Sequence, residues 1–254
     1  MFTVFTKVEN GFDTIVLQDN SNQSRVEVIP ACGAILHAFA VLHKGKLLNI
    51  VDSYASKKSF DEEKEAQGFK SAKLSPYVCR MKAGEYRFGQ KNYKVHKYYL
   101  GEDAIHGLIY DAPFEVIQQE AGEGKALVKM LFHYKGTDAG YPFMYDCSVQ
   151  YELKKNSSLT ISTTIINKDA GMIPLCDGWH PYFSFGGSID DCQLEFQSKE
   201  ILEFDASLIP TGKLIAYSEF GSLKKIGTTF LDNCFTVNFA ECQPMLILRD
   251  PEQK

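Results

Sequence analysis

The stretch YDCSVQYELKKNSSLTISTTI, residues 145–165, decides the fold class of this chain. Its first nine residues alternate, with apolar or aromatic side chains at the odd positions and polar side chains between them. An alternation of period two is typical of a β-strand that buries one face. A polar turn at residues 154–158 and a second alternating run at residues 159–165 follow. Together they predict an antiparallel hairpin with one face in a hydrophobic core.

The same alternation recurs before and after this hairpin. Further strands are predicted at residues 4–8, 14–17, 25–29, 126–134 and 235–239. One segment, Ser59–Ala72, is predicted to be helical, because Ser59 precedes three acidic residues as a helix N-cap does. A single short helix among many strands predicts an all-β fold. The short spacing of the turns favours a large antiparallel β-sandwich.

The composition is that of one globular domain. The 254 residues contain no linker, low-complexity run or internal repeat, so we expect a single domain over residues 1–254. The net charge of −5 and the lack of a basic segment give nucleic-acid binding little electrostatic support, so we expect no nucleic-acid partner. No apolar run is long enough to span a bilayer, and the first residues lack the features of a signal peptide. We therefore expect no membrane partner.

The cysteines indicate the compartment. There are seven of them, an odd number, and no two have the C-x-x-C spacing of a metal or redox site. Scattered cysteines without a secretion signal are typical of reduced thiols. The sequence therefore predicts a cytoplasmic protein.

Two histidines are the strongest candidates for a functional site. His180 lies in the aromatic stretch Gly178–Phe183 (GWHPYF), which could provide a stacking face and a polar group for a sugar ring. The alternative is a buried histidine that caps an aromatic cluster. His106 precedes Gly107, which permits a positive φ or a close backbone approach. Its alternative is an ordinary turn, and only convergence with His180 would make one acid–base site.

Arg80 and Asp232 are the candidate ligands for substrate hydroxyls. Arg80 follows an apolar run, so it either ends a strand in water or offers its rigid set of donors to a sugar. Asp232 opens a predicted strand and precedes an asparagine, a pair that favours an Asx-turn. Its functional alternative is a carboxylate that accepts hydrogen bonds from neighbouring hydroxyls.

Several chemistries lack their sequence motifs. The chain has no H-E-x-x-H or paired-cysteine zinc motif, no G-x-x-x-x-G-K-[ST] phosphate loop, no G-x-S-x-G elbow and no G-x-G-x-x-G dinucleotide fingerprint. We therefore expect neither a metal nor a cofactor.

A series of short motifs extends over nearly the whole chain in a characteristic order. The motifs are Gly33–Leu36 with Lys44–Asn49, Pro76–Tyr93, His106–Gly107, Gly140–Phe143, Asn167 to Pro174 with His180–Phe183, and Leu231–Asn233. In order and spacing they resemble the aldose 1-epimerase (galactose mutarotase-like) family. The resemblance implies a β-sandwich of the supersandwich type, in agreement with the alternation.

The resemblance also implies an activity, the interconversion of the α and β anomers of a free aldose such as a hexose. His180 resembles the general acid that protonates the ring oxygen, and His106 resembles the second histidine of the same region. Arg80 and Asp232 resemble the contacts to substrate hydroxyls. Histidine suits this proton transfer because its pKa lies near neutrality.

Two positions depart from the family pattern. Cys79 stands before Arg80 where the family often has asparagine. The family's catalytic base is a glutamate on a strand near the C-terminus, and no residue here can be placed on it, since Glu241 and Glu252 fall too early. We therefore expect the sandwich to lack the family's last C-terminal strands. Without that glutamate, the chain either binds sugar without turning it over or uses another carboxylate as the base.

Three functions remain open on these residues. The first is an aldose 1-epimerase-like isomerase, and the second is a non-catalytic carbohydrate-binding protein on the same scaffold, which the missing base favours. The third is a hexose-6-phosphate 1-epimerase, which needs a cationic cluster for the phosphate, with Arg80 and Lys82 as candidates. A monomer or a homodimer is expected in each case.

Overall fold

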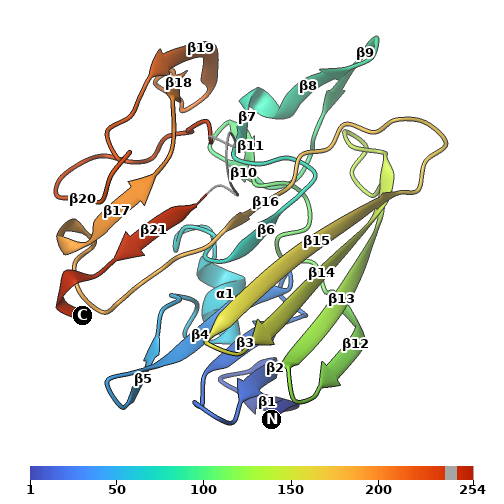
Figure 1. Ribbon diagram of the computed structural model, residues 1–254. Coiled ribbons are helices and arrows are strands. Elements are labelled where there is room, and N and C mark those ends of the chain that lie inside the picture. The colour runs from blue at the N-terminus through green and yellow to red at the C-terminus, as the bar shows by residue number, and fades with distance from the viewer. Residues whose placement is uncertain (238–244, 254) are drawn as a thin grey trace. The chain divides into compact units, whose positions relative to one another are not determined.

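The computed structural model describes residues 1–237 and 245–253 (Figure 1). The chain divides into two compact units, Met1–Phe183 and Ser184–Lys254, and each unit is described here by itself. The single domain expected from the sequence stays a prediction.

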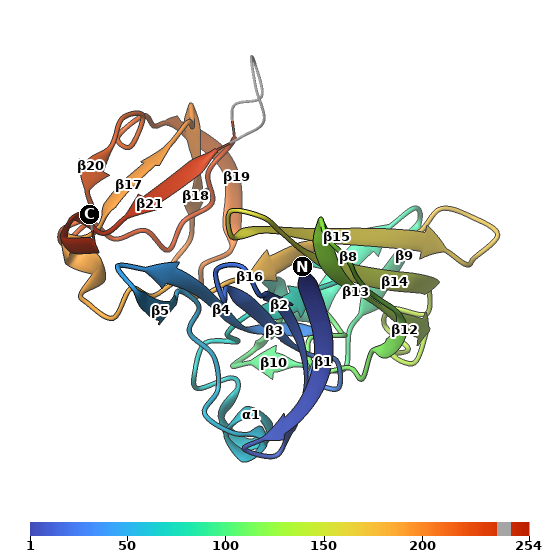
Figure 2. The same ribbon diagram turned by 60° about the horizontal axis from the view of Figure 1, so that its bottom comes forward.

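Two antiparallel sheets dominate the first unit. The first sheet has the order β1 (Phe2–Glu9), β2 (Phe12–Asp19), β3 (Arg25–Ile29), β4 (Ile35–His43) and β5 (Lys46–Asn49). The second has the order β12 (Glu115–Ala121), β13 (Lys125–Lys135), β14 (Met144–Lys154) and β15 (Ser158–Asn167). They can be followed by colour, blue for the first sheet and green to yellow for the second (Figures 1 and 2). The hairpin predicted at residues 145–165 is β14–β15, with Lys154 opposite Ser158.

The hydrophobic core of this unit lies between the two sheets. The odd-numbered residues of β14 from Tyr145 to Leu153 are all fully buried, as the alternation predicts. They pack in one cluster with residues of the first sheet such as Leu17 and Val28. Full burial of each large side chain stabilises the fold by roughly 1.5–3 kcal/mol. The Tyr151 hydroxyl also donates a hydrogen bond to the Ala34 carbonyl oxygen, 2.8 Å away.

These observations confirm the all-β fold class. The helix prediction, in contrast, is wrong at both ends, because α1 comprises Lys57–Glu63. Ser56 is the N-cap, and its hydroxyl accepts from the Ser59 amide while the Ser59 hydroxyl accepts from the Ser56 amide, both at 3.1 Å. Ser59 is therefore the third helical residue of a capping box. The backbone turns left-handed at Gly68 (φ 79°), so no helix continues to Ala72.

Short strands complete the first unit. They are β6 (Ala72–Leu74), β7 (Arg80–Met81), β8 (Glu85–Phe88), β9 (Lys91–Lys94), β10 (Tyr99–Leu100), β11 (Asp103–Ile105) and β16 (Gly178–His180), with the 3₁₀ turn η1 (Lys82–Gly84). The strand β6 pairs with β16, β11 pairs with β7 and β10, and β8 pairs with β9, all antiparallel. The candidate site residues of this unit lie on or beside these short strands.

The second unit has its own small core. Its elements are η2 (Ile189–Asp191), β17 (Gln193–Phe196), β18 (Glu200–Phe204), β19 (Pro210–Ala216), β20 (Lys224–Lys225), β21 (Leu246–Arg249) and η3 (Pro251–Gln253). Phe220 is fully buried and packs with Cys192, Leu194 and Ile226. In the strand predicted at residues 235–239, Phe235 forms an isolated bridge with Ile201, and residues 238 and 239 lie outside the described residues.

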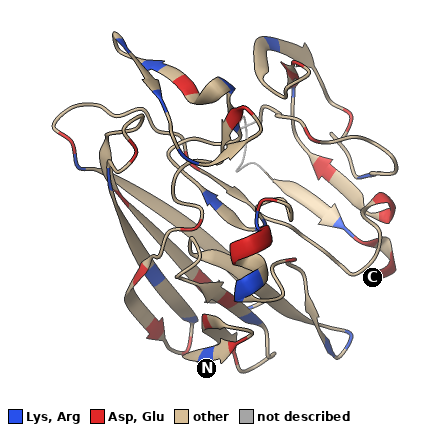
Figure 3. Ribbon diagram, turned by 180° about the vertical axis from the view of Figure 1, so that it is seen from behind, with Lys and Arg blue, Asp and Glu red and all other residues tan. Residues whose placement is uncertain are grey.

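Charges of both signs are interspersed along the ribbon, as Figure 3 shows for the helix and several strands. This distribution agrees with the absence of a basic segment in the sequence. In the part of the chain that the structure describes, the helices are too short and too polar to cross a bilayer.

Candidate functional site

His180 is the last residue of β16. This strand lies antiparallel to β6, with His180 opposite Ala72, and the Ser71 amide donates to the His180 carbonyl oxygen at 2.9 Å. Side chains alternate along a strand, so Trp179 and His180 point to opposite faces. The ring of Trp179 packs on the core residue Tyr151, with centroids 6.0 Å apart. Packing of the partly buried tryptophan against the core therefore turns the imidazole of His180 to the other face of the strand.

His106 directly follows β11 in a left-handed conformation, with φ at 62°. Gly107 is also left-handed, and a Cβ atom there would lie 2.1 Å from the Ser75 carbonyl oxygen. The sequence prediction that Gly107 provides a positive φ and a close approach is therefore confirmed. The His106 amide donates to the Cys79 carbonyl oxygen at 3.0 Å. Cys79 thus fixes His106 through its backbone, which any residue at that position could do.

The fold brings the two histidines together. Their ring centroids lie 4.9 Å apart with an edge-on geometry. Phe69 packs edge-on against His106 at 4.6 Å, and Tyr182 stacks on His180 at 5.5 Å. Two imidazoles with aromatic rings around them form the combination that the sequence predicts for sugar binding.

His106 is held in its neutral form. Only 6% of the residue is exposed, and burial lowers its pKa to about 4, helped by the neighbouring charges of His180 and Arg80. Its Nδ1 atom is buried and has no hydrogen-bond partner among the described residues. At neutral pH this ring can therefore donate from one nitrogen and accept at the other, but it is not a cation.

Arg80 belongs to the same cluster. It lies on β7 opposite Ile105 of β11, the residue that precedes His106. Its side chain is half-buried, and its charge acts on the pKa of His106. Within residues 1–237 and 245–253, no carboxylate forms an ion pair with Arg80. Among the described residues, its donors are therefore not committed to a structural salt bridge.

Asp232 belongs to the second unit and is exposed. Asp232 is not itself in a described strand, and the strand predicted after it, residues 235–239, extends beyond the described residues. Two residues after Asp232, the chain is hydrogen-bonded to β18, since the Leu202 amide donates to the Cys234 carbonyl oxygen at 2.8 Å. Convergence of Asp232 with the histidines stays a prediction. Glu241 lies outside the described residues, and Glu252 is an exposed residue of η3.

Sequence reasoning did not identify Lys73, the central residue of β6. It is completely buried, and its ammonium group contacts the Asp177 carboxylate. It also donates to the Gly178 carbonyl oxygen at 3.2 Å and lies 4.9 Å from the centre of the Trp179 ring. No sequence signal marks this position, because lysine is rarely fully buried and its partners are more than a hundred residues away.

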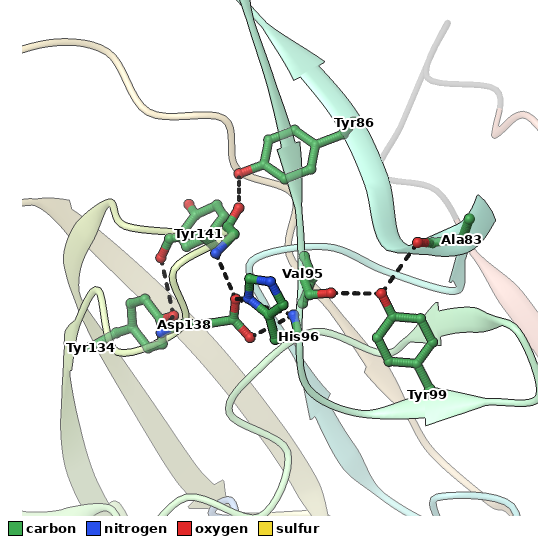
Figure 4. A network of polar contacts seen from close by, with 9 residues as sticks. Ala83, Tyr86, Val95, His96, Tyr99, Tyr134, Asp138 and Tyr141 are labelled. Carbon is green, nitrogen blue, oxygen red and sulfur yellow. Dashed lines mark hydrogen bonds and ion pairs between the residues drawn. The ribbon is translucent and has the colours of Figure 1, made fainter.

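A second polar network fixes the Gly140–Phe143 motif (Figure 4). The buried Asp138 carboxylate accepts from the Gly140 amide at 2.8 Å and from the His96 amide at 2.9 Å. The Tyr86 hydroxyl donates to the Gly140 carbonyl oxygen at 2.8 Å. A Cβ atom at Gly140 would lie 1.7 Å from the Lys94 carbonyl oxygen, so glycine is required. The motif is thus explained by backbone packing.

Among the described residues, no group of three or more histidine, cysteine, aspartate or glutamate side chains is arranged to hold a metal ion. The chemistry that the cluster offers is proton transfer and hydrogen bonding by His106, His180 and Arg80.

Solved structures with the same fold belong to mutarotase-like proteins. A galactose mutarotase-like protein from Clostridium acetobutylicum is 18% identical, with a TM-score of 0.83 over 99% of this chain and 78% of that one. A galactose 1-epimerase from Lactobacillus acidophilus is 19% identical, with a TM-score of 0.78 over 98% and 76%. The GalM/aldose epimerase homologue from C. elegans is 18% identical, with a TM-score of 0.79 over 100% and 77%. At these identities the likeness shows the fold, a galactose mutarotase-like sandwich.

A search of curated proteins found no match. The family comparison is more informative, because the sequence model described as aldose 1-epimerase matches residues 13–254. This match covers nearly the whole chain and includes all four candidate site residues. The chain belongs to the aldose 1-epimerase family.

Proposed function

We propose that this protein binds a free aldose and interconverts its α and β anomers. The observation that carries the proposal is the pair of imidazoles 4.9 Å apart, next to Arg80, in a chain of the aldose 1-epimerase family. Opening a cyclic hemiacetal requires a proton to leave the anomeric hydroxyl and another to reach the ring oxygen. A positioned histidine can deliver the second proton at neutral pH.

The roles of the residues follow from their environments. His180 is the proton donor to the ring oxygen, because it is less buried than His106. His106 is neutral at pH 7, so it orients the substrate through a hydrogen bond. Arg80 donates to sugar hydroxyls with its guanidinium, and Asp232 accepts from sugar hydroxyls with its carboxylate. Rotation of the freed aldehyde and reclosure by the reverse transfers yield the other anomer.

A second candidate function is sugar binding without turnover. The charges that act on the pKa of His106, those of His180 and Arg80, are both positive. Removal of the anomeric proton needs a base, and no carboxylate within residues 1–237 and 245–253 acts on the pKa of His106. This observation favours a binding protein unless a carboxylate completes the site.

The test measures anomer exchange directly. Fresh α-D-glucose and α-D-galactose are followed by polarimetry with the wild-type chain, His180→Ala and His133→Ala. The matched control, His133, is a half-exposed histidine on the β13–β14 pair, bonded to Asp146 at 2.5 Å. We expect acceleration by the wild type and by His133→Ala, and a loss of about 10²- to 10⁴-fold in His180→Ala.

The outcomes separate the functions. Equal rates for all three proteins and for buffer would contradict catalysis. Stabilisation of the fold against heat by sugar, without acceleration, would then identify a binding protein. A preference for hexose 6-phosphates over free hexoses would instead indicate the phosphate-specific isomerase, with Arg80 and Lys82 as phosphate ligands.

We also place the protein in the cytoplasm, as a monomer or a homodimer. The proposal for the compartment is supported by five cysteines that are free thiols, Cys32, Cys79, Cys147, Cys176 and Cys192. Fractionation of cells for the compartment and sedimentation for the oligomeric state would test both parts.

A further inference from the structure

The strand β6 and the residues at its ends contact the segments that carry both histidines. At one end the Ser71 amide bonds the His180 carbonyl oxygen, and Ala72 lies opposite His180. At the other end Ser75 forms a bridge with Gly107, the neighbour of His106. A shift of β16 along or away from β6 would therefore change the separation of the two imidazoles.

The pairing of β6 with β16 is short. It consists of three residue pairs, from Gly178↔Leu74 to His180↔Ala72. These two strands form a sheet of their own, so no further strand holds β16 in place among the described residues. A three-residue strand is a weak unit by itself, because few backbone hydrogen bonds oppose its conformational entropy.

Backbone hydrogen bonds hold the segments on either side of β16, from the Cys176 amide to the Pro76 carbonyl oxygen at 2.7 Å and from the Asp52 amide to the Tyr182 carbonyl oxygen at 2.9 Å. Lys73 adds a side-chain restraint within β16 itself. Its ammonium group contacts three consecutive residues that lead into His180, namely the Asp177 carboxylate, the Gly178 carbonyl oxygen and the face of the Trp179 ring. The ammonium is completely buried, whereas the Asp177 side chain keeps 27% of its exposure. A buried charge makes its interactions strongly dependent on geometry, since an imperfect contact leaves the charge uncompensated.

We infer that the Lys73–Asp177 ion pair is a positioning device that holds β16, and with it the imidazole of His180, at its working distance from His106. The inference rests on the proposed epimerase function for its catalytic consequence. Lys73 and Asp177 do not touch the substrate face themselves. They share the face of Trp179, which alternation places opposite to His180.

The test removes the charges without leaving one of them buried alone. In the double variant Lys73→Met/Asp177→Asn, an apolar side chain of similar length replaces the buried ammonium. Replacement of a buried ion pair by apolar packing is often neutral or stabilising. We therefore expect a folded protein whose Tm is not lower than that of the wild type.

The activity should nevertheless fall. We expect kcat for anomer exchange to decrease about tenfold to a hundredfold, with KM changed less than about twofold. The reason is that the variant alters the orientation of the His180 imidazole and not the binding of the substrate. The ¹H–¹⁵N signals of the His180 imidazole, recorded without sugar, should shift or broaden. Lys125→Met is the control, since it removes an ion pair with Glu152 at 2.6 Å on the β13–β14 pair.

The outcomes distinguish this inference from the proposed function. Normal kcat and unchanged His180 signals in the double variant would overturn the inference while the epimerase activity stands. A wild type without activity would overturn the proposed function, and the imidazole signals would still decide the inference. The inference would also be overturned if the double variant had a lower Tm and lost no more activity than it lost folded protein. A role in stability alone would then explain the result.

Discussion

The β14–β15 hairpin and the β6–β16 pair are both antiparallel, yet different interactions hold them in place. The hairpin has ten residue pairs in register, joined by a short turn, and fully buried side chains along one face. The β6–β16 pair has three residue pairs between segments about a hundred residues apart. Repeated burial secures the hairpin, whereas a few specific contacts secure the pair that carries His180. The scaffold should therefore respond to changes in volume, and the site should respond to changes at single atoms.

The largest expected effect is on the scaffold. Leu153→Ala removes a fully buried side chain of β14 and leaves a cavity, so the free energy of unfolding should decrease by about 3–4 kcal/mol. The His180 imidazole signals should stay unchanged in the folded fraction, because the contacts of β6 and β16 are intact. Chemical denaturation and NMR measure the two quantities. A shift of the His180 signals would show that the two regions are not independent.

The next effect concerns the site. Gly107→Ala places a Cβ atom 2.1 Å from the Ser75 carbonyl oxygen and strains a left-handed residue, at a cost of about 2–3 kcal/mol. Anomer exchange should decrease together with stability, since Ser75 and Gly107 link β6 to His106. Gly122→Ala, at a position with open space around it, is the matched control. Equal stability of the two variants would contradict the close approach.

The pH dependence of stability gives a third test. The pKa of His106 is about 4 in the folded state, below the ordinary value of 6.5. Between these values the unfolded state binds more protons, so stability rises with pH there and is lost as the pH falls from about 6.5 towards 4. The loss at pH 4 should be about 2–3 kcal/mol.

The matched variant for this test is His106→Asn, because asparagine also tolerates a left-handed backbone. Its stability should depend less on pH across the same window, although carboxylates still contribute, as at Asp146, whose pKa is lowered by His133 and Lys168 against the effect of burial. Urea denaturation at several pH values measures the difference. Parallel curves for the two proteins would mean that His106 is not buried as a neutral ring.

The smallest effect returns to the core. Tyr151→Phe removes the hydroxyl that donates to the Ala34 carbonyl oxygen between the sheets, at a cost of about 1 kcal/mol. Activity should stay at the wild-type level, since the ring that packs on Trp179 remains. If the variant lost activity without a further loss of stability, the site would depend on this core hydrogen bond as well as on its own contacts.

Much of the scaffold could be predicted from the sequence. The alternating residues 145–165 predicted β14, β15 and their turn, because burial of one face imposes a period of two. The boundaries of α1 could not be predicted in this way. Both Ser56 and Ser59 can cap a helix, and a reciprocal pair of hydrogen bonds selected Ser56. The strand predicted after Asp232 reaches residues 238 and 239, which lie outside the described residues, so it stays a prediction.

The sequence by itself determined the all-β fold, the likeness to the epimerase family and the two histidines, since side-chain period and motif order are local properties of the chain. The tertiary structure decided which groups meet: His106 beside His180, the depressed pKa of His106, and the contact of Lys73 with Asp177. The physical reason is that burial and charge interactions depend on distances across the fold. Residues far apart in sequence acquire those distances only when the sheets and short strands pack.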